Sequence, residues 1–341
     1  MKIRCYNKIT LTLTGMYTKN VKALTNGARQ ESRSVCVGTK RKGELRKMIR
    51  TEITGIGDPF ILKDGDTYYM YATSAPDGFK YFTSKNLTDW TKGGYCYKDS
   101  PWGENNFWAP EVYARNGKYY MIFTARWKEK HSLRIGVAVA DSPEGEFKDL
   151  LGAPLFDFGY AVIDATLFQD DDGKEYLYYV RDCSENIIDG VHTSEIYCSE
   201  ISPDYRSLVG EPKKITSPDV PWETSLSKEW HWNEGPALWK RNGRYYLNYS
   251  VNCFDSREYS VGCAESTSPW GKFEKYEDNP ILKYEKGEFS GPGHNCFFEG
   301  KDGKLYTAFH IHTDYDKPSG DRRACIAEVY FDEAGKMRFR L

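Results

Sequence analysis

A strand pattern that recurs five times constrains this chain more than any other feature of its sequence. Each copy has an apolar strand, an Asn-Gly or Asp-Gly turn, and then an aromatic strand. The copies begin at Asp58, Ala109, Asp164, Glu234 and Gly293. Such turns favour two positive φ values and therefore close tight β-hairpins. Further apolar runs follow the hairpins, for example at residues 133–140 and 195–201, so each copy predicts a four-stranded antiparallel unit.

The spacing of the copies predicts how the units assemble. They start about 50 to 70 residues apart, which is typical of propeller blades with four strands. One blade cannot bury both of its faces, but five blades around an axis share a core. Hydrophobic residues make up 40% of the chain and aromatic residues 15%, and we interpret the Tyr-rich runs as blade packing. The sequence thus predicts an all-β fold, a five-bladed β-propeller over residues 48–341.

Residues 1–47 differ in composition from the rest of the chain. They hold 12 Lys+Arg against 2 Asp+Glu, so the remainder holds 35 against 47 within a net charge of −2. An acidic body argues against nucleic acid as a partner. A basic tail for nucleic acid or a membrane is one interpretation of residues 1–47. We favour a disordered leader, or a start assigned too early with Met48 as the true one, because so polar a segment buries too little to order.

The cysteines and the apolar runs bear on localisation. Nine cysteines are scattered without Cys-x-x-Cys pairs, and Cys198, Cys263 and Cys325 fall within expected strands. This is typical of reduced, buried thiols rather than of a disulfide framework or a zinc site. Residues 9–16 are too broken by threonine for a signal peptide, and no run of about 18 apolar residues is present to span a membrane. We therefore expect a cytoplasmic protein with no membrane partner, and the oligomeric state stays open.

Acidic residues open three of the five copies, at Asp58, Asp164 and Glu234. Side chains at one repeated position of a propeller should point at a common axis, so we expect these carboxylates to converge in one pocket. Converging carboxylates are costly unless they do chemistry. An isolated Asp before Pro is usually a turn residue, and Asp164 lies inside an apolar strand where a lone carboxylate is expensive, so the set carries the argument. Glu111 is offset by two residues and is interpreted as a structural or rim residue.

Five short segments at the heads of successive copies form an ordered set. They are Gly57-Asp58-Pro59, Trp108-Ala109-Pro110-Glu111-Val112, Ile163-Asp164-Ala165-Thr166, Glu234-Gly235-Pro236 and Gly291-Pro292-Gly293-His294-Asn295. Any one segment recurs by chance, but in this order they resemble glycoside hydrolase family 43, five-bladed propellers that cleave arabinose- and xylose-containing polysaccharides. The resemblance runs from about residue 55 to residue 341. It implies hydrolysis with inversion, with Asp58 as general base, Glu234 as general acid and Asp164 as the residue that tunes and orients the acid.

The chemistry explains why such a set is needed. An inverting glycosidase uses one carboxylate to activate water and one carboxylic acid to protonate the leaving oxygen, roughly 6.5–9.5 Å apart. Strand heads of different blades can supply that gap. Asp58 must stay ionised, whereas Glu234 must keep its proton, so its pKa must be raised. A negative Asp164 and an apolar wall from Trp230-His231-Trp232-Asn233 would both raise it.

Further site residues follow from the resemblance. It implies that His294 faces the central channel and that several members bind calcium there, largely through waters. No cofactor is required, and a structural Ca²⁺ at His294 is the one metal to consider, although Ca²⁺ prefers oxygen ligands. Hydrogen bonding near the sugar is the alternative role of His294. Trp108 is the candidate for stacking on a sugar, with blade packing as its alternative.

Three residues of the fifth copy are also candidates. In the family an Arg on the late strand reaches the sugar or the acid, which points to Arg322. Alternation puts Arg322, Ala324 and Ile326 on one face of that strand, and the sequence leaves open which face looks inward. His310 and His312 follow the aromatic strand and either line the site or pack in the core.

The sequence therefore predicts an inverting glycosidase for α-L-arabinofuranosyl or β-D-xylosyl linkages, with an arabinose- or xylose-containing oligosaccharide as its partner. An endo-acting arabinanase of the same family and a non-catalytic carbohydrate-binding propeller are the alternatives. The chain ends soon after the fifth copy, without the added β-sandwich of many β-xylosidases, which favours arabinofuranosidase or arabinanase activity. Short imported oligosaccharides would favour exo action. Recurring Gly-His and Trp-Asp signatures of interaction propellers are absent from the sequence, as are a Gly-x-Ser-x-Gly elbow and a P-loop.

Overall fold

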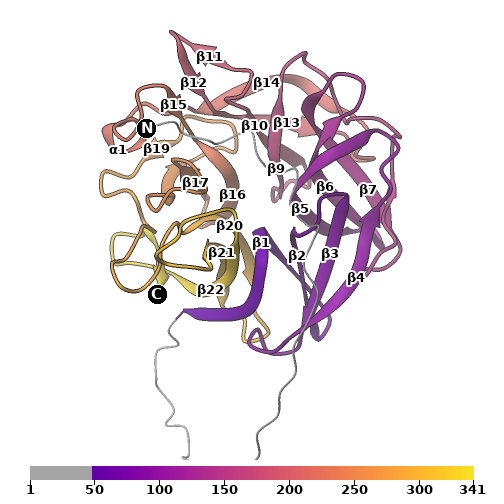
Figure 1. The fold of residues 1–341 in the computed structure, drawn as a ribbon, viewed down its shortest axis with the longest axis horizontal. Helices are drawn as coiled ribbons and strands as arrows, with labels where there is room; N and C mark the ends of the chain where they lie inside the picture. The colour runs from indigo at the N-terminus through magenta and orange to yellow at the C-terminus, as the bar shows by residue number, and fades with distance from the viewer. Residues whose placement is uncertain (1–47) are drawn as a thin grey trace, which may run out of the picture. The chain divides into compact units, whose positions relative to one another are not determined.

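A computed structural model describes residues 48–341, so the predictions made for residues 1–47 lie outside the described residues. This part of the chain is built from β-strands, and the one helix within it is the short α1 (Pro221–Thr224). The strands form five four-stranded antiparallel blades, as the repeat predicts. Figure 1 shows the first strand of every blade close to a common centre.

The blades follow one another along the chain. Blade 1 consists of residues 57–64 of β1 (Ile49–Asp64), β2 (Thr67–Thr73), β3 (Gly78–Ser84) and β4 (Trp90–Lys98). Blade 2 consists of β5 (Gly103–Arg115), β6 (Lys118–Trp127), β7 (Ser132–Ala140) and β8 (Lys148–Asp149). Blade 3 consists of β9 (Val162–Gln169), β10 (Glu175–Arg181), β13 (Glu195–Ile201) and β14 (Leu208–Thr216). Blade 4 consists of β16 (Glu234–Arg241), β17 (Arg244–Val251), β18 (Ser260–Ser266) and β19 (Glu274–Lys275). The first three strands of blade 5 are β20 (Gly293–Glu299), β21 (Leu305–His312) and β22 (Arg322–Phe331).

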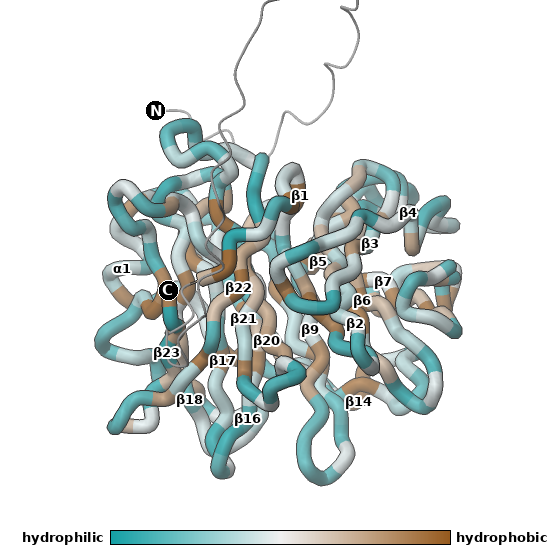
Figure 2. The backbone as a smooth tube through the Cα atoms, turned by 90° about the horizontal axis from the view of Figure 1, so that it is seen from below, coloured by the Kyte–Doolittle hydropathy of each residue, from teal (hydrophilic) through white to brown (hydrophobic). Residues whose placement is uncertain are grey.

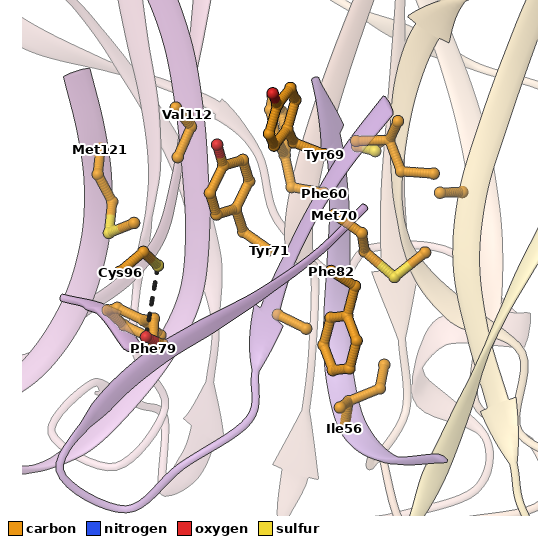
Figure 3. Packing of buried hydrophobic residues seen from close by; sticks show 14 of the residues in the cluster. Ile56, Phe60, Tyr69, Met70, Tyr71, Phe79, Phe82, Cys96, Val112 and Met121 are labelled. Carbon is orange, nitrogen blue, oxygen red and sulfur yellow. Dashed lines mark hydrogen bonds between the residues drawn. The ribbon is translucent and has the colours of Figure 1, made fainter. Parts of the chain in front are cut away.

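Both ends of the described chain complete blade 5. Residues 49–56 of β1 pair with the first half of β22, and β23 (Met337–Arg340) pairs with its second half. Blades 1 and 5 thereby join in one eight-stranded sheet. Ile53 and Ile56 are buried, and Figure 3 shows Ile56 beside Phe82 of blade 1. The sequence repeat begins at Asp58 and did not predict this closing strand.

The turns and the core agree with the sequence pattern. In the two Asn-Gly turns both residues have positive φ, whereas in the Asp-Gly turns the positive φ falls on the glycine alone. The Tyr-rich strands are buried, Tyr71, Tyr178 and Tyr249 completely so, which confirms their role in packing. The hydrophobic segments lie within the strands, and many of the hairpin turns are hydrophilic (Figure 2).

The described thiols match expectation. All seven described cysteines are buried, and none of them forms a disulfide. Cys96, for example, donates from its Sγ to the carbonyl of Phe79 at 3.3 Å within the core shown in Figure 3. None of the described helices is long and apolar enough to cross a membrane.

Two insertions around blade 3 form a small extra sheet (Figure 1). It contains β11 (Ile187–Ile188), β12 (Val191–Thr193) and β15 (Trp230–His231). β12 pairs in parallel with β15, and the rings of His192 and Trp230 stack 3.9 Å apart. Because β15 is followed almost at once by Glu234, this sheet borders the acidic end of blade 4.

Every inner strand carries a β-bulge at the same place. The bulge puts one residue of each blade at positive φ: Asp58 (54°), Ala109 (44°), Asp164 (53°), Gly235 (51°) and His294 (48°). Asp58, Asp164 and His294 therefore share one structural position. Glu234 lies one residue earlier, where Gly57 stands in blade 1. The expectation that all three acids occupy one repeated position is thus wrong for Glu234, because Gly235 is the bulge residue of its blade.

Candidate active site

A ring of hydrogen bonds holds the bulge residues. Four of their backbone N–H groups donate to a side chain at the end of the second strand of the preceding blade. The pairs are Asp58 to His310 Nδ1 (3.2 Å), Ala109 to Thr73 Oγ1 (2.9 Å), Asp164 to Thr124 Oγ1 (3.0 Å) and His294 to Ser250 Oγ (2.8 Å). A non-glycine residue at positive φ is unfavourable unless its surroundings fix it, and these bonds provide that restraint.

Blade 3 breaks the ring and replaces the missing acceptor with a carboxylate. Its equivalent position is Val180, which pairs with Ile163 and has no side-chain acceptor. The N–H of Gly235 donates instead to Asp164 Oδ2 at 3.2 Å. Asp164 is therefore both a bulge residue and the acceptor that links blade 3 to blade 4.

Asp58 lies among donors. Arg322 Nη1 is 2.9 Å from Oδ1, the Thr73 hydroxyl donates to Oδ2 at 2.6 Å, and His294 Nδ1 lies 3.4 Å from Oδ1. Burial alone would raise the pKa of Asp58, since the side chain is only 11% exposed, but Arg322 and then His294 outweigh it and hold that pKa well below its usual range. Asp58 is thus ionised at any working pH.

Asp164 experiences the opposite balance. His294 Nδ1 lies 3.8 Å from its Oδ2 and therefore between the two aspartates. Burial raises the pKa of Asp164 to about 6, and the charges of Asp58 and Asp182 add to this rise, whereas His294 and the Gly235 N–H oppose it. The structure thus brings Asp58, Asp164 and His294 together, with different protonation behaviour for the two aspartates.

Glu234 is buried at the start of β16, where the Ser194 hydroxyl donates to its Oε1 at 3.0 Å. A buried tyrosine connects it to the aspartates. Burial, followed by the charges of Glu234, Asp164 and Asp58, raises the pKa of Tyr259 well above its usual value. All three acids therefore act electrostatically on one phenol group, whose ring packs so closely on Gly293 that a Cβ there would overlap it.

The remaining predicted residues fall into two groups. Arg322 faces inward and binds Asp58, and a Cβ on Gly57 would overlap its guanidinium group. His310 also lines the site: its Nδ1 accepts the Asp58 N–H, and burial lowers its pKa well below the usual value, so the ring is neutral. Both ring nitrogens of His312 bond elsewhere, to the Ser290 hydroxyl and the Phe254 carbonyl, so this residue is structural.

Trp108 and Glu111 both lie on β5. Trp108 is half-buried and packs against the edge of the apolar cluster that blades 3 and 4 form. Glu111 is buried, so the rim interpretation is wrong. Burial raises the pKa of Glu111 to about 8 although the Tyr113 hydroxyl donates to it, so it stays protonated at neutral pH as a structural group.

The described residues do not build a calcium cage around His294. Its Nδ1 faces Asp58 and Asp164, whose oxygens already bond to Arg322, Thr73 and the Gly235 N–H. Within residues 48–341, the one group of three metal-ligating side chains contains Asp182, Cys183 and Glu234, and includes a thiol. Ca²⁺ takes six to eight oxygen ligands, so direct coordination at His294 does not fit.

Sequence reasoning missed Thr73, Ser194, Asp182 and Tyr259. A signal for the first was present, because the aromatic strands of four copies end in Thr73, Thr124, Ser250 and His310. These are the acceptors of the ring. The other three lie in the loops between the second and third strands of blades 3 and 4, outside the part of the copies that repeats.

The propeller and its buried acids define a carbohydrate-cleaving hydrolase of the propeller class. The sequence model of glycosyl hydrolases family 43 matches residues 54–337, and the chain belongs to this family of glycoside hydrolases.

Named relatives within the family act on several sugars. A beta-D-galactofuranosidase of Aspergillus niger is 30% identical over 288 residues, which cover 79% of this chain and 78% of the relative. An extracellular exo-alpha-(1→5)-L-arabinofuranosidase of Streptomyces avermitilis is 25% identical over 315 residues, covering 83% of this chain and 61% of the relative. The crystal structure of a thermostable family-43 glycoside hydrolase is 44% identical, with a TM-score of 0.83, over 86% of this chain and 95% of that one.

Proposed function

We propose that this glycosidase cleaves α-L-arabinofuranosyl or β-D-xylosyl linkages with inversion, using Asp58 as general base, Glu234 as general acid and Asp164 as the residue that tunes the acid. The observation that carries the proposal is the difference between neighbouring carboxyl groups. Arg322 keeps Asp58 ionised, whereas burial and like charges favour the protonated form of Asp164. An environment that keeps a carboxyl group ionised fits the base, Asp58. Glu234, buried and bonded to the Ser194 hydroxyl, is the carboxyl group assigned to the acid.

The proposed reaction needs no group beyond these side chains. Glu234 gives its proton to the glycosidic oxygen as the C1–O bond breaks. Asp58 takes a proton from the water that attacks C1 from the opposite face. The strong stabilisation of Asp58 makes it a weak base, which suffices because the water loses its proton as it bonds to an oxocarbenium-like carbon. The products are a sugar of inverted anomeric configuration and a leaving group with a new hydroxyl, and proton exchange with solvent resets both carboxyl groups.

Two observations support the choice of substrate. Relatives are named for arabinofuranosyl, xylosyl and galactofuranosyl cleavage, so furanosides and xylosides are the substrates to test first. Asp58 and Asp164 have side chains only 11% and 10% exposed, which favours a closed pocket over an open groove and hence exo action.

The test is a panel of nitrophenyl α-L-arabinofuranoside, β-D-xyloside and β-D-galactofuranoside together with linear arabinan, with the first-formed anomer followed by ¹H NMR. We expect inversion and release of single sugars. Retention of configuration would overturn the mechanism, and rapid formation of mid-sized arabinan fragments would favour the endo alternative.

Two substitutions test the assigned roles. Asp58→Asn should lower kcat/KM on every substrate by about 10²–10⁴-fold or more, because no other group activates the water. Glu234→Gln should impair alkyl glycosides far more than dinitrophenyl glycosides, which need little protonation. Equal losses on both substrate kinds would contradict the role of Glu234, and binding without turnover in the wild type would favour a carbohydrate-binding propeller.

A further inference from the structure

A buried carboxylate that the sequence pattern did not indicate lies beside Glu234. Asp182 directly follows β10 and is fully buried. One of its oxygens, the Cys183 Sγ and a Glu234 oxygen all lie within 4.8 Å of one another. Asp182 Oδ1 accepts the backbone N–H of Ser184 at 3.0 Å and also its hydroxyl. Donors of this kind stabilise the charged form of a carboxyl group.

Ser194 contacts the other side of Glu234. Its Oγ accepts the N–H of Cys183 at 3.2 Å and donates to Glu234 Oε1 at 3.0 Å. A hydroxyl has one hydrogen, and the bond from Cys183 leaves that hydrogen directed at Oε1. The backbone clamps Ser194 in place, since its N–H donates to the carbonyl of His231 at 2.9 Å and its carbonyl accepts the N–H of Asn233 at 3.2 Å.

We propose that Ser194 and Asp182 are positioning residues for the general acid: Ser194 occupies Oε1, so the proton of Glu234 is on Oε2, and the Asp182 carboxylate keeps it there until the glycosidic oxygen takes it. Two buried carboxylates this close do not both ionise readily, as in carboxylate pairs that share a site. The inference rests on the proposed role of Glu234 and assigns it a second acidic neighbour besides Asp164.

Two neighbouring groups, Asp164 and Tyr259, carry no positive charge that would offset the effect of Asp182 on the Glu234 proton. Asp164 accepts the N–H of the adjacent Gly235, and Tyr259 is an un-ionised phenol close to all three acids. His294 packs beside Gly235 but lies between the two aspartates.

Lys275, which approaches Asn233 next to Glu234, is engaged with other acids. Lys275 Nζ is 3.4 Å from the oxygen of Asn233, but it lies 2.6 Å from Glu223 and 2.7 Å from Asp219. The charge of Asp182 also raises the pKa of Asp164.

The test is the pH dependence of kcat/KM for Asp182→Asn on an alkyl glycoside of the sugar that the wild type cleaves. Removing the like charge should move the alkaline limb of the profile down by about one pH unit or more. The profile on a dinitrophenyl glycoside should not move, since that substrate needs no acid. Asp189→Asn, an exposed substitution in the same insertion, is the matched control. A uniform loss at all pH values, with the limb unmoved, would overturn the inference.

Two further comparisons keep the inference testable if Asp182→Asn does not fold. Ser194→Ala should lower kcat on alkyl glycosides at least tenfold with little change in KM, and Ser194→Thr, which keeps the hydroxyl, should restore it. Equal rates for Ser194→Ala and the wild type would overturn the role of Ser194. In a Glu234→Gln background, Asp182→Asn should add no further loss, and an additive loss would overturn the coupling.

These outcomes separate the inference from the proposed function. A wild type inactive on every glycoside, or Glu234→Gln with unchanged activity, would overturn the proposed function. An active wild type, an impaired Glu234→Gln variant and an unshifted Asp182→Asn variant would overturn the inference alone.

Discussion

Asp164→Asn should make the protein more stable at alkaline pH while it removes activity. The pKa of Asp164 rises from 3.8 to about 6 in the folded state, chiefly because the side chain is buried. Below pH 4 the group is protonated in folded and unfolded chains alike, so it adds no penalty. Between pH 4 and 6 only the unfolded chain releases the proton, and the folded state loses stability as pH rises. Above pH 6 the full penalty applies.

The size of the penalty follows from the shift. About two pKa units correspond to about 3 kcal/mol at 1.36 kcal/mol per unit. Solvent screening reduces this little, because the side chain is only 10% exposed. Asparagine fills the same space, carries no charge and still offers an oxygen to the N–H of Gly235. The free energy of unfolding of Asp164→Asn should therefore exceed that of the wild type by about 3 kcal/mol more at pH 8 than at pH 4.

Urea unfolding followed by tryptophan fluorescence at pH 4, 6 and 8 measures this difference. Asp58→Asn is the informative comparison because its sign is opposite. The depressed pKa of Asp58 contributes stability above about pH 4 that is lost as pH falls, and the substitution leaves Arg322 without its buried partner. That variant should be less stable at pH 7 by about 3 kcal/mol or more. A difference between Asp164→Asn and the wild type that stays constant within about 0.5 kcal/mol from pH 4 to pH 8 would refute the reasoning.

Three more outcomes are expected. Gly57→Ala should displace the Arg322 guanidinium group from Asp58. Since the base must be ionised, the acid limb of the kcat/KM profile should move up by about one to three pH units. Gly94→Ala, where the added Cβ meets open space, should leave the profile unchanged, and identical profiles for both variants would exclude the contact with Arg322 as the reason for the glycine. A chain that starts at Gly57 should lose about 3–6 kcal/mol of unfolding free energy relative to one that starts at Met48, because the buried Ile53 and Ile56 of the closing strand are removed, and equal urea midpoints would contradict this. EDTA should leave kcat/KM and Tm unchanged, because the donors around His294 form no calcium cage; a loss that Ca²⁺ restores would instead establish a water-mediated site.

The propeller could be predicted because each blade repeats the same local chemistry. Hairpin turns and aromatic strands recur in every copy, so five weak signals reinforce one another. The closing strand at residues 49–56 could not be found this way, because it pairs with β22, more than 260 residues further along the chain. Nothing in its own sequence distinguishes a partner in blade 5 from one in blade 1.

The site residues could be predicted where they fall on the repeated part of the blades. Asp58 and Asp164 stand at the repeated bulge, and His294 shares it, so the repeat brings them together. Glu234 was placed one residue off, because a glycine at the bulge of blade 4 leaves no side chain to align. Ser194 and Asp182 lie at the two ends of an insertion that occurs in blade 3 alone among the described blades, and comparison between copies is silent about such a segment.

Because Val180 offers no side-chain acceptor, one oxygen of Asp164 serves both the fold and the site. Elsewhere around the central ring a hydroxyl or an imidazole accepts the N–H of the next blade. Between blades 3 and 4 the acceptor of this N–H is an oxygen of Asp164. A homologue with an apolar residue in place of Asp164 would lose the hydrogen bond between blades 3 and 4 together with a carboxyl group of the site. A threonine at position 180 would supply a substitute acceptor and release Asp164 from its structural task, so propellers of this kind that have given up hydrolysis are where that exchange should be sought.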